Sequence, residues 1–162
     1  MRVTDFTILL VEDDPNDIVL IQRAFAKAAL VNPLRIVRDG EEALQYLAGR
    51  PPYTDRGRHP LPSLILLDLK LPRKSGLEVL EWIRQQEHLG HIPVIVLTSS
   101  REMRDVNRAY ELGANSYLVK PVGFEGLLEM VKAIGMYWVI LNKGPESPRP
   151  APTSLPDASE RS

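Results

Sequence analysis

ILLVEDD at residues 8–14 joins four apolar side chains to three acidic ones, and this change from apolar to polar recurs three more times along the chain. Residues 64–68 read LILLD, residues 94–99 read VIVLTS, and residues 117–120 read YLVK. Short, continuous apolar runs are typical of strands that are buried on both faces of a parallel sheet. In such sheets the functional groups lie just beyond the carboxyl ends of the strands. The four polar ends are therefore expected to meet at one edge of the sheet.

Strand-like and helix-like segments alternate five times along the chain. Strands are expected at residues 6–11, 34–38, 63–68, 93–98 and 115–119. Helices are expected at about 15–30, 41–48, 77–88 and 102–112, with a last helix that carries Phe124, Leu127, Leu128, Val131, Ile134 and Trp138 at helical spacing. This alternation predicts a doubly wound α/β fold, in which helices cover both faces of a parallel sheet.

The composition excludes several classes of protein. The 162 residues are 44% hydrophobic and 25% charged, with a net charge of −1, which gives no case for binding to nucleic acid or to an anionic membrane. There is no cysteine, which excludes disulfide bonds and thiolate metal sites. No apolar stretch is long enough to span a membrane, and the first residues do not form a secretory signal. A cytoplasmic protein is expected.

Two segments do not fit the alternating pattern. Residues 49–62 (GRPPYTDRGRHPLP) are rich in Pro, Gly and Arg, so we expect an irregular loop, solvated at the surface in preference to binding a partner. Residues 143–162 hold many prolines and show no apolar periodicity, which predicts a disordered tail. The folded domain is accordingly expected at residues 1–142.

The acidic strand ends have the ligand types that a magnesium ion requires. Mg²⁺ prefers oxygen ligands and uses one or two carboxylates, which Asp13 and Asp68 can supply, while Glu12 can bind through a water molecule. Crowded carboxylates are costly to ionise together, and a divalent cation removes that cost. In the simpler interpretation, Asp13 and Asp14 only cap the following helix, whose positive end Asp17 also favours. That interpretation leaves Asp68 unexplained.

Asp68 is also a candidate nucleophile, because a carboxylate can accept a phosphoryl group to give an acyl phosphate. Phosphoryl transfer requires neutralisation of the charge on three equatorial oxygens. The Lys120 ammonium supplies a point charge for one oxygen, and the Thr98 hydroxyl can donate to another. A cis bond between Lys120 and Pro121 would aim the lysine inward, and the sequence leaves both isomers open.

The motifs ILLVEDDP, LILLDLKLPRKSG, VIVLTSS and SYLVKP resemble, in this order, the acidic, phosphoacceptor, hydroxyl and lysine motifs of the receiver domains of two-component response regulators. The resemblance covers about residues 5–140. It implies a flavodoxin-like (CheY-like) fold with a five-stranded parallel sheet in the order 2-1-3-4-5 and five helices. The protein would then be no enzyme acting on a separate substrate, and would catalyse only its own phosphorylation and dephosphorylation.

The same resemblance implies a role for each site residue. Asp68 is the phosphoacceptor and, together with Glu12, Asp13 and the backbone carbonyl of Lys70, binds Mg²⁺. Thr98 and Lys120 contact the phosphoryl group. Tyr117 matches the switch aromatic residue, which turns inward as Thr98 moves toward the phosphate.

The chain further resembles stand-alone response regulators that pair with phytochrome-type sensor kinases. This resemblance rests on VEDDPND, the loop at 49–62, DLKLPRKSG and the position of Trp138. It implies a sensor histidine kinase as phosphoryl donor and an unknown downstream protein as target, contacted through the helix at 102–112, the strand at 115–119 and the last helix.

Several alternatives stay open. The protein could carry or store phosphoryl groups in a phosphorelay, or act as an interaction module without phosphorylation. A phosphatase of the aspartate-nucleophile type is disfavoured, because such enzymes have their nucleophile on the first strand. Residues 130–141 (MVKAIGMYWVIL) are apolar beyond one helical stripe, which fits either a homodimer surface or a cover for the domain's own core.

Overall fold

The computed structural model describes residues 6–136 and confirms the predicted α/β fold. Five parallel strands form one sheet in the order β2-β1-β3-β4-β5. The strands are β1 (Ile8–Val11), β2 (Leu34–Val37), β3 (Leu64–Leu67), β4 (Val94–Thr98) and β5 (Ser116–Val119). The helices are α1 (Pro15–Lys27), α2 (Gly40–Ala48), α3 (Gly76–Gln85), α4 (Met103–Glu111) and α5 (Phe124–Ile134).

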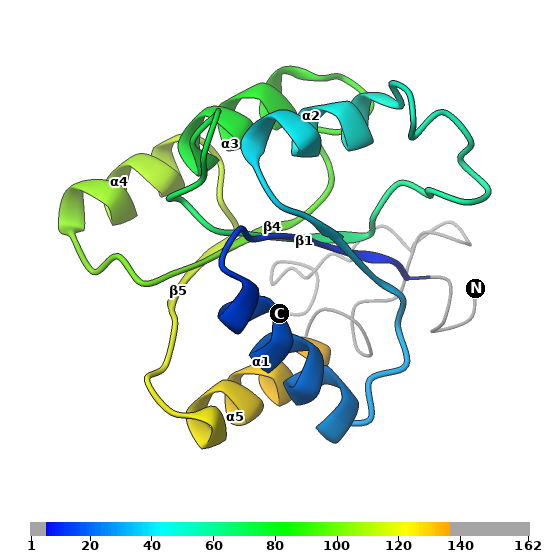
Figure 1. Cartoon of the computed structure of the whole chain (residues 1–162). Coiled ribbons are helices and arrows are strands. Elements are labelled where there is room, and N and C mark those ends of the chain that lie inside the picture. The colour runs from blue at the N-terminus through cyan, green and yellow to red at the C-terminus, as the bar shows by residue number, and fades with distance from the viewer. Residues whose placement is uncertain (1–5, 137–162) are drawn as a thin grey trace, which may run out of the picture.

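Helices cover both faces of the sheet (Figure 1). α2, α3 and α4 lie on one face, and α1 and α5 lie on the other. From β1 the chain runs to the edge strand β2 and then returns to β3 on the opposite side of β1. Ligands of open α/β sheets bind where the direction of winding reverses in this way, outside the carboxyl ends of the strands. The expected site therefore lies beyond the ends of β1 and β3.

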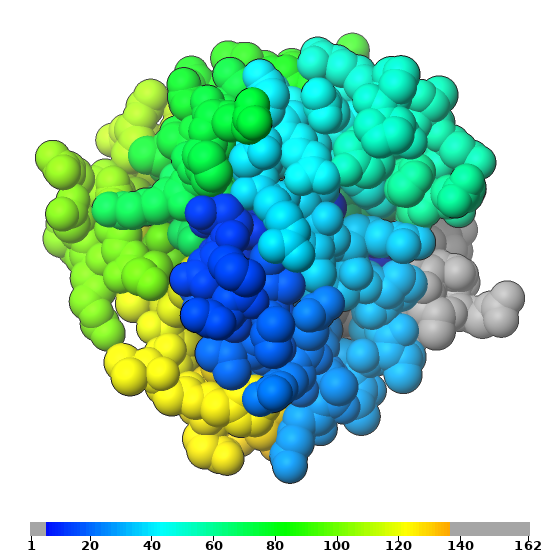
Figure 2. Space-filling view, in the orientation of Figure 1, coloured from blue at the N-terminus to red at the C-terminus, as the bar shows by residue number. Residues whose placement is uncertain are grey.

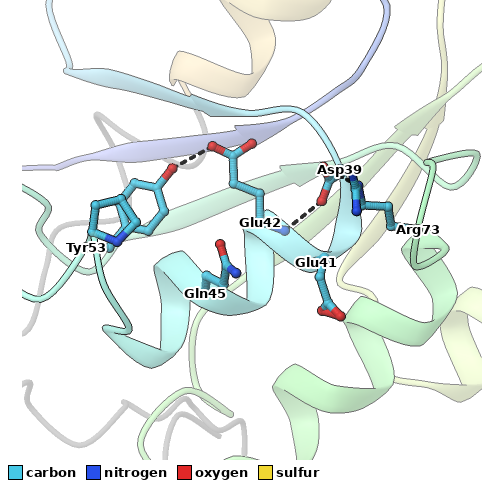
Figure 3. Close-up of a pocket in the computed structure, with 7 residues that line it drawn as sticks. Asp39, Glu41, Glu42, Gln45, Tyr53 and Arg73 are labelled. Atoms are coloured by element: carbon cyan, nitrogen blue, oxygen red, sulfur yellow. Dashed lines mark hydrogen bonds and ion pairs between the residues drawn. The ribbon is translucent and has the colours of Figure 1, made fainter.

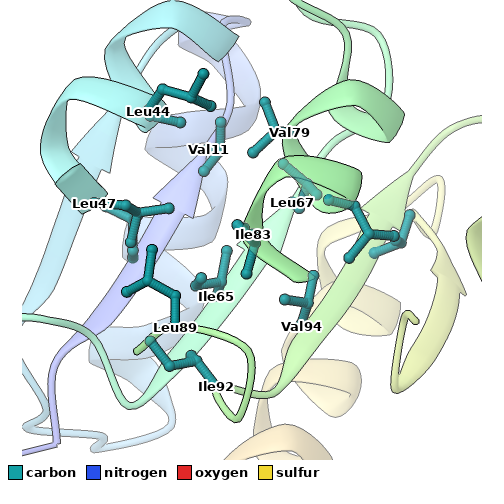
Figure 4. Close-up of a cluster of buried hydrophobic side chains, with 14 of the residues drawn as sticks. Val11, Leu44, Leu47, Ile65, Leu67, Val79, Ile83, Leu89, Ile92 and Val94 are labelled. Atoms are coloured by element: carbon teal, nitrogen blue, oxygen red, sulfur yellow. The ribbon is translucent and has the colours of Figure 1, made fainter. Parts of the chain in front are cut away.

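Alternating side chains of the central strands fill two separate cores. Leu9 and Val11 of β1 belong to the core beneath α2 and α3 (Figure 4), whereas Ile8 and Leu10 belong to the core beneath α1 and α5. Every residue of β1, β3 and β4 is buried. Burial on both faces explains why these strands are unbroken apolar runs, and each buried aliphatic side chain contributes about 1.5–3 kcal/mol.

The prediction of burial on both faces is wrong for residues 117–119. All four residues of β5 are only half-buried. These residues are less buried because β5 lies at the edge of the sheet and has one neighbouring strand, β4. An apolar run alone does not distinguish an edge strand that is covered in part from a central one.

Helices α1 and α3 end about three residues earlier than predicted. After α1 the chain turns at Ala29, which has a φ of 60°, and the backbone N–H of Leu30 then donates to the carbonyl of Phe25. Leu30 packs against the core beneath α1 and α5. After α3 the chain becomes extended at Gln86 and buries Leu89 completely. In both places a leucine that packs on the core draws the chain out of the helix, without a glycine to mark the stop.

The loop at 49–62 is irregular, as predicted, but it is attached to the domain and is not simply solvated. The Arg56 guanidinium donates to the carbonyls of Tyr46 and Leu47 at 2.9 Å each, which satisfies the last turn of α2. In return, the Tyr46 hydroxyl donates to the carbonyl of Pro60 at 2.8 Å. The loop therefore packs back against the helix that precedes it.

Some predictions lie outside the described residues. These are the tail at 143–162, the domain boundary at 142, Trp138 and the apolar residues 137–141. They stay predictions. Among the helices that residues 6–136 form, none has the length and apolar character needed to cross a membrane.

Candidate functional site

The carboxyl edge of the sheet gathers polar side chains from four strands. Glu12 and Asp13 follow β1, Asp68 follows β3, Thr98 ends β4, and Lys120 follows β5. Since all the strands are parallel, these ends lie at one edge. Glu12, Asp68 and Thr98 are buried there, although polar groups are rarely buried without partners. Their partners define the site.

The Asp68 carboxylate is oriented by the backbone around it. Its own N–H donates to the carbonyl of Val11 at 3.1 Å, which continues the pairing of β3 with β1 for one residue. Its Oδ1 accepts from the N–H of Leu69 at 2.7 Å and, at a longer 3.4 Å, from that of Lys70. These bonds fix the carboxylate and leave Oδ2 directed at Lys120.

The Lys120 ammonium donates to three carboxylates at once. Its Nζ lies 2.6 Å from Glu12 Oε1, 2.8 Å from Asp17 Oδ2 and 3.0 Å from Asp68 Oδ2. The lysine side chain is 11% exposed, so these bonds form largely out of water. Hydrogen bonds between charged groups are shorter and stronger than neutral ones, particularly at low dielectric. The ammonium therefore joins the ends of β1, β3 and β5 to the start of α1.

Burial and hydrogen bonding shift the pKa values of both Glu12 and Lys120. The pKa of Glu12 is raised to about 7, chiefly by burial; the hydrogen bond from Lys120 opposes the increase, and the charge of Asp68 adds to it. Burial alone would lower the pKa of Lys120, but the hydrogen bonds with Asp17 and Glu12 outweigh it and raise that pKa above its ordinary value. The lysine is therefore fully charged at neutral pH.

Three carboxylates form a candidate metal site beside this lysine. One oxygen each from Glu12, Asp13 and Asp68 lies within 4.8 Å of the other two. Oxygen donors at such spacing fit a hard cation such as Mg²⁺, and the cation would offset the repulsion between the carboxylates. The donor set therefore fits the expected metal. That the backbone carbonyl of Lys70 is a further ligand of the metal stays a prediction.

Thr98 and Tyr117 are linked through Ser100. The Thr98 side chain is buried, and its oxygen accepts from the N–H of Ser100 at 3.5 Å. The Ser100 carbonyl accepts from the Tyr117 hydroxyl at 3.0 Å, and its Oγ donates to Asp105 on α4. Burial raises the pKa of Tyr117, so its hydroxyl remains a donor. A movement of Thr98 would thus reach both the aromatic ring and α4.

The backbone around Lys120 extends the edge of the sheet. Its N–H donates to the carbonyl of Thr98 at 2.8 Å, which aligns the two strand ends. Among residues 6–136, the bond between Lys120 and Pro121 is not cis, and the cis peptide bond lies at Pro51–Pro52 instead. Lys120 reaches the site through a trans bond, one of the two isomers that the sequence leaves open.

Asp17 is the site residue that sequence reasoning missed. The sequence suggested only that its charge favours the positive end of a helix. The structure adds its contact with Lys120, which lies 103 residues further along the chain. One signal was available, because Asp17 lies in the first turn of the helix that directly follows the acidic end of β1.

A separate acidic pocket lies beside α2 (Figure 3). It has a volume of about 370 Å³ and is lined by Asp39, Glu41, Glu42, Gln45, Pro52, Tyr53 and Arg73. Its charged groups have partners, since Asp39 pairs with Arg73 at 3.4 Å and Glu42 accepts from the Tyr53 hydroxyl. None of the strand-end residues of the metal cluster lines this pocket, so it is distinct from the candidate site.

Comparisons with known proteins agree with this geometry. A family model described as the response regulator receiver domain matches residues 8–132. FilR2 of Methanothrix harundinacea is 44% identical over 140 residues, which is 86% of this chain and 88% of FilR2. Response regulator Rcp1 of Synechocystis is 42% identical over 132 residues, which is 82% of this chain and 88% of Rcp1. The crystal structure of Rcp1 with bound Mn²⁺ matches with a TM-score of 0.78 at 41% identity, over 86% of this chain and 99% of the Rcp1 chain. The crystal structure of the phosphorylated cyanobacterial phytochrome response regulator RcpA matches with a TM-score of 0.80 at 39% identity, over 86% of this chain and 98% of RcpA.

Proposed function

The chain belongs to the response regulator receiver family, and we propose that it accepts a phosphoryl group on Asp68 from the phosphohistidine of a sensor kinase. The observation that carries this proposal is the carboxylate of Asp68, held with one oxygen on the backbone and the other against Lys120. The phosphorylated structure of RcpA, at 39% identity, supports it. We place the reaction in the cytoplasm, as the sequence predicts.

The transfer is a direct displacement at phosphorus. Oδ2 of Asp68 forms the new P–O bond as the P–N bond of the phosphohistidine breaks, and the electron pair of that bond returns to the imidazole nitrogen. The backbone N–H of Leu69 holds Oδ1, which limits rotation of the nucleophile. Lys120 neutralises charge on one phosphoryl oxygen, and the hydroxyl of Thr98 donates to another.

Glu12, Asp13 and Asp68 would hold Mg²⁺, with the Lys70 carbonyl completing the protein ligands. When bound, the ion supplies positive charge to the phosphoryl oxygens. The Mn²⁺-bound structure of Rcp1 supports a divalent cation in this family, and an oxygen-only donor set suits a hard cation such as magnesium. The same groups would also govern hydrolysis of the acyl phosphate, which is the only other reaction we assign to the protein.

The signal would leave through α4, β5 and α5. We propose that Thr98 moves toward the phosphoryl group and that Ser100 passes this movement to Tyr117 and Asp105. This face carries exposed apolar side chains, among them Met103 and Tyr110 of α4 and, just before α5, Val122. Such exposed apolar side chains are available for contact with another protein or with a second copy of the chain.

The donor that fits best is a phytochrome-type sensor kinase. The support is similarity alone, because RcpA is a phytochrome response regulator and this chain covers 98% of it. Transfer from such a kinase, followed by transfer to a second histidine protein, would instead indicate a phosphate carrier within a relay.

Incubation with acetyl phosphate and Mg²⁺ tests the acceptor without knowledge of the kinase. We expect the wild-type protein to gain the mass of one phosphoryl group and the Asp68→Asn variant to gain none. Asp39→Asn is the matched control, because Asp39 also follows a strand at this edge and caps α2, a role that asparagine can keep. Chelation of Mg²⁺ should stop the uptake. Labelling of Asp68→Asn would overturn the assignment of Asp68 as the acceptor, and a wild-type protein that takes no label would favour the interaction module over a phosphorylated regulator.

A further inference from the structure

All the hydrogen-bond donors of Lys120 are engaged. An ammonium has three N–H groups, and three carboxylates accept from them. The acceptors come from distant parts of the chain: Glu12 from the end of β1, Asp17 from α1, and Asp68 from the end of β3. In the space-filling view the blue segment that contains α1 lies against the yellow segment that follows β5 (Figure 2). Lys120 is thus saturated before any phosphoryl group is present.

A phosphoryl oxygen on Asp68 can obtain a donor only if Lys120 gives up one of these contacts. Glu12 is the less favourable contact to release, because its side chain is 1% exposed and water cannot take the place of the lysine there. When Oδ2 of Asp68 forms the P–O bond, its negative charge passes to the phosphoryl oxygens, so the ammonium has to shift in order to follow that charge. Asp17 is 31% exposed, and water can replace the lysine there. The contact with Asp17 is therefore the one that this shift can break.

We propose that Asp17 is a positioning residue that holds Lys120 beside Asp68 and releases it when a phosphoryl group arrives. The inference rests on the proposed function, because it assumes that Lys120 contacts that group. Since Asp17 and the phosphoryl oxygens compete for the position of the ammonium, Asp17 lowers the affinity of the site for the phosphoryl group. Its carboxylate thereby adjusts the balance between the free and phosphorylated states.

The test uses the full-length protein and beryllofluoride, a mimic of the phosphoryl group, at saturating Mg²⁺. Asp17→Asn should bind beryllofluoride about two- to fivefold more tightly than the wild type, which corresponds to the strength of a partly exposed ion pair. Fluorine NMR of the bound ligand measures this affinity. Asp17→Glu restores a carboxylate and should return the affinity toward the wild-type value.

Asp14→Asn is the matched control for loss of one negative charge. Asp14 stands at the same helix start, but its carboxylate accepts from the backbone N–H groups of Asn16 and Asp17 instead of from a lysine, and asparagine also caps helices well. A smaller gain in affinity for Asp14→Asn than for Asp17→Asn supports the competition. Equal gains would mean that general electrostatics explain the effect and would overturn the inference.

Nitrogen NMR of the Lys120 ammonium separates positioning from a purely structural role. We expect its resonance to differ between the wild type and Asp17→Asn in the free proteins and to coincide once beryllofluoride is bound, because the contact has then been released. A difference that persists in the bound state contradicts the release. If the wild-type protein binds no beryllofluoride at all, the proposed function fails. Equal gains in affinity for Asp17→Asn and Asp14→Asn would instead overturn the inference about Asp17 alone.

Discussion

The hydroxyl of Tyr117 on β5 donates a 3.0 Å hydrogen bond to the backbone carbonyl of Ser100, in the turn that leads into α4. The ring is half-buried and packs against the core beneath α2 and α3. Ser100 in turn bonds to Asp105, so β5 and α4 share one small polar network. This network connects the buried hydroxyl of Thr98 to the proposed output face.

Replacement of Tyr117 by phenylalanine should weaken that connection. The variant retains the ring but leaves the carbonyl of Ser100 without its donor, so we expect a loss of about 1 kcal/mol in the free energy of unfolding. Hydrogen exchange of residues 100–106 should become faster. Urea denaturation and exchange followed by NMR measure the two effects.

Tyr110→Phe is the control for this change. Tyr110 is 49% exposed, and its hydroxyl accepts from the N–H of Tyr117, where water can take its place. We expect Tyr110→Phe to lower the free energy of unfolding by less than about 0.5 kcal/mol. Equal losses in the free energy of unfolding for Tyr117→Phe and Tyr110→Phe would show that the hydrogen bond to Ser100 stabilises the fold no more than the exposed one does.

Local sequence patterns predicted the strands and the main site residues for a physical reason. A strand buried on both faces must be apolar until it reaches the sheet edge, so the first polar residue, such as Asp68, marks the edge and the site together. No such rule identifies Asp17, because its partner lies 103 residues away. The end of α1 was missed for a related reason, since Ala29 takes a positive φ only because Leu30 packs on a core assembled from other elements.

Arg84 on α3 is a second residue whose role depends on distant parts of the chain. Its guanidinium donates to the carbonyls of Gly90 and Ile92 at 2.9 and 2.8 Å, and to that of Gly113 at 3.0 and 2.9 Å. It also donates to the side-chain oxygen of Asn115 at 2.9 Å. One side chain therefore joins the turn before β4 to the turn before β5.

Arg84→Ala should lower the free energy of unfolding by about 3 kcal/mol, because it leaves several carbonyl groups without their charged donor. Arg104→Ala is the matched control, since Arg104 pairs with Glu102 on the surface and is 85% exposed. Such exposed pairs contribute about 0.2–1 kcal/mol at most. Urea denaturation compares the two, and a loss for Arg84→Ala as small as that of the control would contradict this account.

The loop at 49–62 should make stability depend on pH in the alkaline range. The Tyr53 hydroxyl donates to Glu42, and burial, with the help of this bond, raises the pKa of Tyr53 from 10.0 to about 12. Above pH 10 the unfolded chain releases this proton first. The stabilisation that Tyr53 provides is therefore fully present below pH 10 and is lost as the pH rises through about 12.

The measurement is the difference in unfolding free energy between the wild type and Tyr53→Phe as a function of pH. It should be constant below pH 10 and shrink as the pH approaches 12. Glu42→Gln removes one cause of the raised pKa of Tyr53 and should move the decline to lower pH. A difference that does not change across this range would mean that the hydroxyl keeps its proton equally well in the unfolded chain.

Gly76, the first residue of α3, is required because the backbone of Asp68 passes directly against it. A Cβ atom there would stand 2.6 Å from Cα of Leu69 and still closer to the carbonyl oxygen of Asp68. Its φ is not positive, so the requirement is for space and not for backbone conformation. Helix propensity alone predicts that Gly76→Ala stabilises the protein, by up to about 1 kcal/mol.

We expect the opposite result, a loss of about 1–3 kcal/mol, because backbone atoms on both sides must shift to admit the methyl group. The shift would move Asp68, so phosphorylation by acetyl phosphate should also become slower. Gly90→Ala is the control, since a Cβ there meets its nearest atom at 3.4 Å, and it should be neutral or slightly stabilising. If Gly76→Ala were as stable and as readily phosphorylated as Gly90→Ala, the close approach of α3 to Asp68 would have no part in shaping the site.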